Sequence, residues 1–489
     1  MHHPPSTAAD AARFIRDRLP PGGLFADQHW RIAPEPFALG PDLARELESL
    51  GRVLLQFYRA VNLLYRQSVA GKQPSWVADW LDRGKPADLI ELQRAPAFKN
   101  DLPRVIRPDL LLTETGVTVT ELDSVPGGIG LTAWLNQTYA QLGARTQARG
   151  AKAPADNLSS AAHEPPIPEG RDAFHCVPDL SGKDGDAVER VPTGFARGMI
   201  EGFAGIFGDA PRVHVVVSEE AATYRPEMDW LCEQLDSPRF KVQGSKFDGF
   251  AEGDAVYRFF ELFDLANVPN ARAIFDLARA KKIRLTPPPK PIFEEKLLFA
   301  LLWNRNLRGF WRQELGEAFF HRLLERVPYS WIIDPTPLPP HAAIPELNLT
   351  DWHQLQTLSQ RERELILKVS GFSAQAWGAR GVYLGSDLSS ADWSAAVDQA
   401  IASASHSPHV LQRYLKPRLV EAHYFDFERN ALVPMPGRVR LCPYYFVVGD
   451  GDAARPHLGG VLATICPADK KIIHGMKDAI LAPCVVALG

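Results

Sequence analysis

Short apolar runs alternate with helix-like segments between residues 213 and 285, and this alternation limits the possible folds more than any other feature of the chain. Residues 213–217, 240–242, 255–260 and 283–285 are typical of buried strands, and residues 226–235 and 271–280 of helices. Strands that alternate with helices along the chain form a parallel sheet with helices on its faces. The stretch lacks a glycine-rich dinucleotide turn, so we do not expect an NAD-binding domain.

Size and composition restrict the class of protein. The 489 residues are enough for about three domains. The hydrophobic content of 45% and charged content of 23% are typical of a globular protein with a core. The net charge of −4 and the absence of a basic run argue against a nucleic-acid partner. The 5 cysteines form no C-x-x-C pair, which argues against a disulfide framework or a zinc site.

The localisation that we expect is cytoplasmic, without a membrane partner. The first residues lack the pattern of a signal peptide, and the sequence has no apolar run of about 18 residues.

Five segments follow from the patterns along the chain. We expect a helical N-terminal region at 1–100, a metal-binding part at 101–149, a linker or insertion at 150–191, a Rossmann-like α/β domain at 192–290 and an ATP-binding part at 291–489. The linker is assigned because residues 150–191 are rich in Ala, Pro, Gly, Ser and Asp and show no period.

Three carboxylates, Asp109, Glu121 and Asp123, follow one another at intervals of twelve and two residues. The residues between them predict a hairpin that turns near Thr115, and alternation along the second strand places Glu121 and Asp123 on one face. Three oxygen donors on adjacent strands suit Mg²⁺. The plainer interpretation is that acidic residues at strand ends are solvated.

A glycine run, residues 127–130, follows the hairpin and precedes a helix that begins near Leu131. Bare backbone N–H groups at a helix N-terminus can hold an anion, so phosphate binding is one interpretation. The alternative is a simple turn.

The last third of the chain predicts a second group of phosphate-binding residues. Lys368 lies in an apolar strand, where a lysine is costly unless it is paired. The glycine-rich segment 371–385 follows, with Arg380, and can close over phosphates. Lys296 begins a helix and could equally be solvated, and Arg380 could be a surface residue.

In this order the motifs resemble the circularly permuted form of the ATP-grasp superfamily, and most of all the synthetase domain of glutathionylspermidine synthetase. That family has Asp, then Glu twelve residues on, then Asn two residues on; this chain has Asp123 in place of the Asn. Its Asn-Lys-x-x-Leu-x-x-Leu-Trp helix is approximated by residues 296–303, and its glutamine-containing hinge by residues 412–417. The order agrees over roughly residues 105–465.

The resemblance implies an α/β (α+β) fold, a circularly permuted ATP-grasp with a Rossmann-like pre-ATP-grasp domain. It implies an ATP- and Mg²⁺-dependent, ADP-forming ligase that joins a small carboxylate to an amine through an acyl phosphate. Asp109, Glu121 and Asp123 would hold Mg²⁺. ATP would be contacted by Lys296, Lys368, Gly371, Ser373, Gly378, Arg380, Gln412 and Tyr414.

One element of the family is missing. The family has an essential arginine in a Gly-x-x-x-Arg-Glu-Asp segment near the C-terminus, and residues 459–469 contain none. We expect Arg440, or Arg438, to supply the catalytic charge from a neighbouring strand. A phosphotransferase and a catalytically degenerate nucleotide-binding scaffold remain as alternatives. The sequence does not identify the acid, the amine or the oligomeric state.

Overall fold

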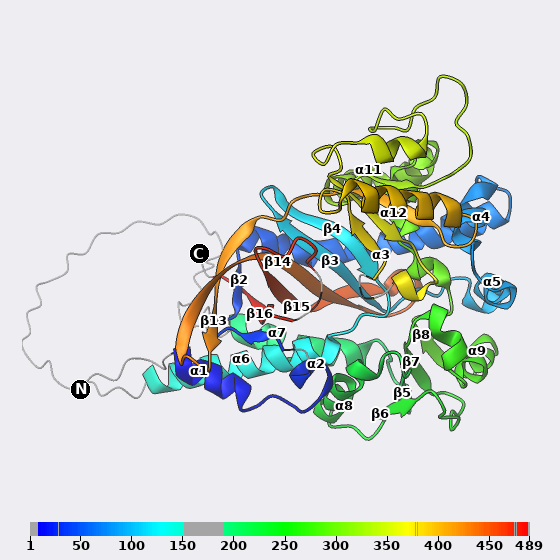
Figure 1. The fold of residues 1–489 in the computed structure, drawn as a ribbon. Coiled ribbons are helices and arrows are strands. Elements are labelled where there is room, and N and C mark those ends of the chain that lie inside the picture. The colour runs from blue at the N-terminus through cyan, green and yellow to red at the C-terminus, as the bar shows by residue number, and fades with distance from the viewer. Residues whose placement is uncertain are drawn as a thin grey trace, which may run out of the picture.

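The structure, a computed structural model, describes residues 8–27, 29–150, 190–376, 378, 380–473, 475 and 477–487. Three sheets organise these residues (Figure 1). A sheet of eight strands lies at the centre, a parallel sheet of four strands lies at one end of the molecule, and an antiparallel sheet of four strands lies beside α12. The segment expected to be a linker lies almost entirely outside the described residues.

The central sheet joins strands from both ends of the chain. Its order is β1-β16-β15-β14-β3-β4, with β13 added to β14 and β2 to β16. The bounds are β1 (Arg31–Ile32), β2 (Phe37–Leu39), β3 (Val105–Thr113), β4 (Gly116–Asp123), β13 (Leu419–Asp426), β14 (Ala431–Val448), β15 (Arg455–Pro467) and β16 (Ile480–Val486). The predicted hairpin at residues 109–123 is therefore part of the same sheet as the C-terminal strands.

The long strand β14 has helices on both of its faces. Val439 and Leu441 belong to the core that contains α3 (Pro41–Val69), whereas Cys442 and Tyr444 belong to the core that contains α6 (Ile129–Gly150) and α7 (Arg190–Gly205). Successive residues of a strand point to opposite faces, which explains this division. β14 is one continuous strand over these residues.

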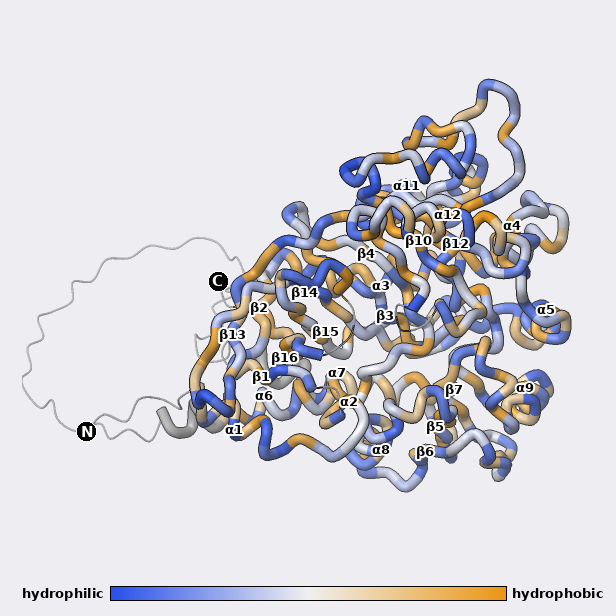
Figure 2. Tube along the Cα trace, in the orientation of Figure 1, coloured by the Kyte–Doolittle hydropathy of each residue, from blue (hydrophilic) through white to orange (hydrophobic). Residues whose placement is uncertain are grey.

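The parallel sheet confirms the α/β unit expected from the alternating pattern. Its order is β6-β5-β7-β8, and all three pairings are parallel. The bounds are β5 (Val213–Val217), β6 (Phe240–Gly244), β7 (Ala255–Phe259), β8 (Arg284–Thr286), α8 (Arg225–Gln234) and α9 (Ala271–Arg279). In Figure 2, α9 changes between polar and apolar residues over short distances. It buries Ala271, Ile274, Phe275 and Ala278, the spacing of a helix with one apolar face.

The antiparallel sheet has the order β11-β10-β12-β9, and it carries the predicted lysine strand. The bounds are β9 (Ser330–Ile332), β10 (Leu365–Val369), β11 (Val382–Leu384), β12 (His409–Arg413), α10 (Leu297–Trp303), α11 (Arg308–Arg326) and α12 (Ser390–Ser403). The predicted helix at 390–403 is confirmed with the same bounds.

The N-terminal region is helical, as predicted, but it shares its core with the rest of the chain. Its helices are α1 (Ala8–Arg16), α2 (Gly23–Ala26), α3, α4 (Ser75–Asp82) and α5 (Ala87–Arg94). Leu54 and Tyr58 of α3 lie in the same cluster as Leu110 of β3 and Leu298 of α10. Among the described residues, no helix is both long and apolar enough to cross a membrane.

Candidate functional site

A cavity of about 240 Å³ lies where the three sheets meet, and we refer to it as the central cavity. The hairpin β3–β4 forms one wall with Arg107, Asp109, Glu121 and Asp123. The segments that follow β5 and β7 form a second wall, and β10 with the glycine-rich segment after it forms a third. The carboxyl ends of neighbouring parallel strands are a common place for a ligand crevice in α/β sheets.

The hairpin predicted from the sequence is present, and it brings Asp109 alongside the second strand as expected. Asp109 is paired with Glu121, and Arg107 with Asp123. Glu121 and Asp123 lie two residues apart on β4, so their side chains leave the strand on the same side. Both line the central cavity.

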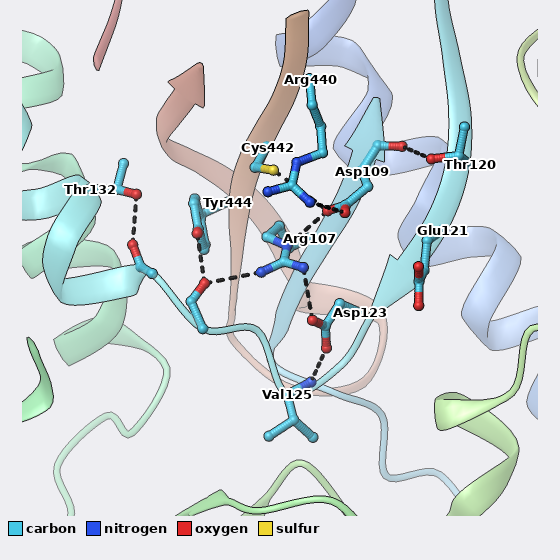
Figure 3. A network of polar contacts seen from close by, with 12 residues as sticks. Arg107, Asp109, Thr120, Glu121, Asp123, Val125, Thr132, Arg440, Cys442 and Tyr444 are labelled. Carbon is cyan, nitrogen blue, oxygen red and sulfur yellow. Dashed lines mark hydrogen bonds and ion pairs between the residues drawn. The ribbon is translucent and has the colours of Figure 1, made fainter. Parts of the chain in front are cut away.

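Arg107 links two of the three carboxylates (Figure 3). Its Nε lies 3.1 Å from Asp109 Oδ1, and its Nη2 lies 2.9 Å from Asp123 Oδ2. Burial acts to lower the pKa of Arg107, but the two carboxylates outweigh it and hold the pKa well above its ordinary value. Burial also raises the pKa of Asp123, against the influence of Arg107.

Asp109 is enclosed by two guanidinium groups. Arg440 of β14 places Nη1 3.1 Å from Asp109 Oδ2, whereas Arg107 contacts Oδ1 (Figure 3). The Asp109 side chain is only 8% exposed. Its carboxylate is therefore held by the chain's own cations.

The three predicted metal ligands do not assemble into a three-carboxylate site. No group of three or more His, Cys, Asp or Glu residues among the described residues could hold a metal ion. All three line the central cavity, but the side chains of Glu121 and Asp123 are 37% and 24% exposed, whereas that of Asp109 is 8% exposed. Mg²⁺ has six ligands, so two carboxylates can hold it only together with water and substrate phosphates.

Two lysines, both predicted from the sequence, line the central cavity. Lys296 lies just before α10 and places Nζ 2.9 Å from Glu121 Oε1. Lys368 of β10 donates to the carbonyl of Thr120 and to Gln412 Oε1, each at 3.0 Å. Burial lowers the pKa of Lys368 to about 8, although Glu121 acts in the opposite direction. Burial also acts to raise the pKa of Glu121, but Lys296 and Lys368 outweigh it and lower that pKa.

The two residues expected near adenine have different positions. Tyr414 lines the central cavity, whereas Gln412 does not. Gln412 is buried, accepts from Lys368 and donates to Ser330 Oγ at 3.1 Å. In this structure Gln412 supports the lysine.

The glycine-rich segment after β10 covers one side of the central cavity. Gly371, Ser373 and Gly378 line it. A Cβ on Gly371 would lie 2.7 Å from the Glu295 carboxyl carbon, so only glycine fits there. Arg380 does not line the cavity; it pairs at 3.3 Å with Glu220, which belongs to the segment after β5.

At the glycine run 127–130, a carboxylate of the chain itself accepts backbone N–H groups that could otherwise face a phosphate. Glu227 of α8 accepts the N–H of Gly128 at 2.7 Å and that of Leu131 at 2.8 Å, at the start of α6. Burial raises the pKa of Glu227 to about 7, while these backbone donors act to lower it. An acidic group does lie at this helix N-terminus, but it is the side chain of Glu227 in α8.

Close packing explains the glycines themselves. A Cβ on Gly127 would lie 2.1 Å from the Tyr224 ring, and one on Gly130 would lie 2.0 Å from the Glu227 carbonyl oxygen. The Gly127 carbonyl accepts from Arg107 Nη1 at 3.0 Å and from the Tyr444 hydroxyl at 2.8 Å (Figure 3). The turn therefore positions Arg107.

The two candidate catalytic arginines are not equivalent. Arg440 lines the central cavity. Arg438 does not line it and donates to the carbonyl of Lys470 at 2.9 Å. Of the two alternatives, Arg440 is therefore the one that lies at the central cavity.

Several groups beside the cavity were not identified as site residues from the sequence. Arg107 is one of them, and its position two residues before Asp109 on the same strand places both side chains on one face. Glu261 and Glu294 also line the cavity, and burial followed by the charge of Glu294 holds the pKa of Glu261 well above its ordinary value. No local pattern in the sequence marks these two glutamates as neighbours.

Comparison with solved structures identifies a protein of similar fold. A glutathione synthetase-like effector from Globodera pallida aligns with a TM-score of 0.54 at 10% identity, over 99% of this chain and 98% of that one. This chain shares the fold of that effector. A candidate gamma-glutamylcysteine synthetase from Methylobacillus flagellatus aligns with a TM-score of 0.37 at 12% identity, over 88% of each chain. No family model and no curated protein matches the sequence.

Proposed function

We propose that the protein is an ATP- and Mg²⁺-dependent ligase that joins a carboxylate to an amine. The observation that carries the proposal is the composition of the central cavity, which gathers Lys296, Lys368, Arg440, Glu121 and Asp123 from four separate stretches of the chain. Phosphoryl transfer needs mainly positioning and cations around the phosphate oxygens. The fold shared with a glutathione synthetase-like effector is consistent with such a ligase.

The reaction has two balanced steps. An oxygen of the substrate carboxylate attacks the γ-phosphorus of ATP, and the bond to the bridging oxygen breaks, so ADP leaves. The amine nitrogen then attacks the acyl carbon, phosphate leaves, and the nitrogen loses a proton. The acyl phosphate must be kept from water, and the segment that contains Gly371, Ser373 and Gly378 is placed to do this.

We assign roles to the chain's residues as follows. Lys296 and Lys368 bind phosphate oxygens, and Arg440 faces the transferring group as the catalytic arginine. Glu121 and Asp123 hold Mg²⁺, which would neutralise phosphate charge when bound. Arg107 orients Asp123 and Asp109, to which it is already paired.

A nucleotide-binding scaffold without turnover is the second candidate. It is favoured by the ion pairs of the site, because Asp109, Glu121 and Asp123 each already pair with a cation of the chain. A phosphotransferase would use the same cavity but release a stable phosphorylated product.

The test is turnover of ATP with Mg²⁺ and a library of acids and amines. ADP and phosphate release that requires both an acid and an amine would support the ligase. A stable phosphorylated product would indicate a kinase, and nucleotide binding without turnover would indicate the scaffold. Glu121→Gln should abolish turnover while the fold is retained. Glu114→Gln, at the exposed turn of the same hairpin, is the matched control.

A further inference from the structure

A second cavity, of about 700 Å³, lies beside β8 at the edge of the parallel sheet, and we call it the edge cavity. Its walls come from α3, the segment before β3, β8 with the end of α9, and the end of β14 with the turn after it. It shares no lining residue with the central cavity. Val256, on its wall, and Phe259, on the wall of the central cavity, belong to the same strand, so the two cavities lie toward opposite ends of β7.

Basic side chains outnumber acidic ones around the edge cavity. The basic residues are Arg59, Arg66, Arg104, Lys281 and Arg284. The acidic residues are Asp101, Asp450 and Asp452. Arg104 pairs with Asp450, Lys281 lies 3.6 Å from Asp101, and Arg284 lies 2.7 Å from Asp209. Asp452 is exposed.

Two arginines of α3 have no carboxylate partner among the described residues. Arg59 donates Nη2 to the carbonyl of Gly451 at 2.7 Å, which leaves its charge uncompensated. No hydrogen bond or ion pair of the Arg66 guanidinium is found within the part of the chain that the structure describes. The two residues are seven apart, so they lie on the same face of the helix about 10 Å apart along its axis. Asn62 lies between them, and its side chain is buried at the cavity wall.

The remaining wall is largely apolar. Phe98, Leu102, Phe207, Ile283 and Leu285 line it. The cavity volume is within the range of roughly 300–1,000 Å³ that small-molecule sites have, and such sites combine apolar walls with a few polar anchors. Planar guanidinium groups bind carboxylate and phosphate oxygens in a bidentate manner.

We propose that the edge cavity binds a small organic anion, with its carboxylate or phosphate on Arg59 and Arg66 and its apolar body against Phe98, Phe207 and Ile283. The charge of the cavity also acts on Lys290, whose Nζ donates to Asn62 Oδ1 at 3.0 Å. Burial lowers the pKa of Lys290 to about 7, and Arg66 and Lys281 lower it further against Asp101. A bound anion would compensate this excess of positive charge.

Calorimetric titration of the full-length protein tests the proposal with two probes, hexanoate and hexyl phosphate. We expect saturable binding of at least one probe. The probe that binds more tightly identifies the headgroup that the edge cavity prefers. Arg59→Ala and Arg66→Ala should each weaken binding by about tenfold or more, the scale of one lost charge-assisted hydrogen bond. Arg52→Ala removes an exposed arginine of the same helix and should leave binding unchanged. Arg66→Gln, which keeps the length of the side chain, replaces Arg66→Ala if the latter does not fold.

Two further measurements separate this site from others. Lys368→Ala should not change the affinity for the probes, because Lys368 belongs to the central cavity. Inorganic phosphate should bind more weakly than hexyl phosphate, because it lacks the apolar body. The proposal is overturned if neither probe binds, if the arginine variants bind like the wild type, or if inorganic phosphate binds as tightly as hexyl phosphate.

Discussion

Lys368 is the residue whose surroundings most clearly favour binding of an anion. Its ammonium group is buried and has only neutral hydrogen-bond acceptors, the Thr120 carbonyl and the Gln412 amide. Lys368→Ala should weaken binding of a non-hydrolysable ATP analogue by about 1.5–3 kcal/mol, the contribution of a hydrogen bond to a charged group. Calorimetry measures this, with Lys416→Ala as an exposed control on the connector after β12. If the affinity for the ATP analogue is unchanged in Lys368→Ala, then Lys368 contributes to packing and not to nucleotide binding.

The shifted pKa of Lys290 should make the stability of the protein depend on pH. Burial lowers its pKa in the folded protein to about 7, from 10.5 for an ordinary lysine. Between these values the unfolded chain binds a proton that the folded protein does not. Stability should therefore rise with pH over this window, by up to about 1.4 kcal/mol per pH unit from this group.

The comparison of wild type with Lys290→Met isolates that contribution. Thermal unfolding from pH 7 to pH 10 should show a smaller increase of Tm with pH in Lys290→Met, because methionine does not titrate. Equal slopes in the two proteins would mean that the buried amine remains protonated in the folded state.

At the scale of elements, the N-terminus of α6 is capped by a residue of α8. Glu227 accepts two backbone N–H groups, and its side chain is fully buried. Glu227→Ala would leave both donors buried without partners, at a cost of about 1–3 kcal/mol for each. We expect a lower urea midpoint of unfolding, with a smaller loss in Glu227→Gln because its amide oxygen can still accept. Glu233→Ala, an exposed change on the same helix, is the control. A midpoint that does not move in Glu227→Ala would show that water replaces the carboxylate.

This capping interaction also connects elements of the candidate site. The turn that Glu227 holds offers the Gly127 carbonyl to Arg107, and Arg107 pairs with Asp109 and Asp123. The parallel sheet thus contributes to the position of the carboxylates through α8, in addition to forming a wall of the central cavity.

At the scale of the whole molecule, a buried ion pair joins the N-terminal helical region to the segment just before α10. Lys85 pairs with Glu295, and their side chains are 0% and 1% exposed. Glu295 also accepts from Ser370 at the end of β10. Lys85→Ala should destabilise the protein by about 3–5 kcal/mol, because it leaves a buried carboxylate without its cation.

The double variant Lys85→Met with Glu295→Met should recover most of that loss, since it removes both charges from the interior. Thermal unfolding measures both variants, and Lys72→Ala provides an exposed control. If Lys85→Ala is as stable as the wild type, the pair does not hold the two parts together.

Local patterns in the sequence determined much of the fold. The alternating apolar runs predicted the parallel sheet, and the residues between Asp109 and Asp123 predicted the hairpin. Lys296 and Lys368, which the sequence suggested as phosphate contacts, both line the central cavity, and their contact with phosphate stays a prediction. These features depend on neighbours within a few residues, which the sequence displays directly.

Only the tertiary structure decided which groups meet. Glu227 occupies the N–H groups of the glycine run from about a hundred residues away in sequence, and Arg440 reaches Asp109 from a strand near the C-terminus. Arg438 turns to a backbone carbonyl although it lies on the same strand as Arg440. Burial and electrostatic pairing act through space, so the partner of a buried charge is set by how the sheets pack and not by any pattern along the chain.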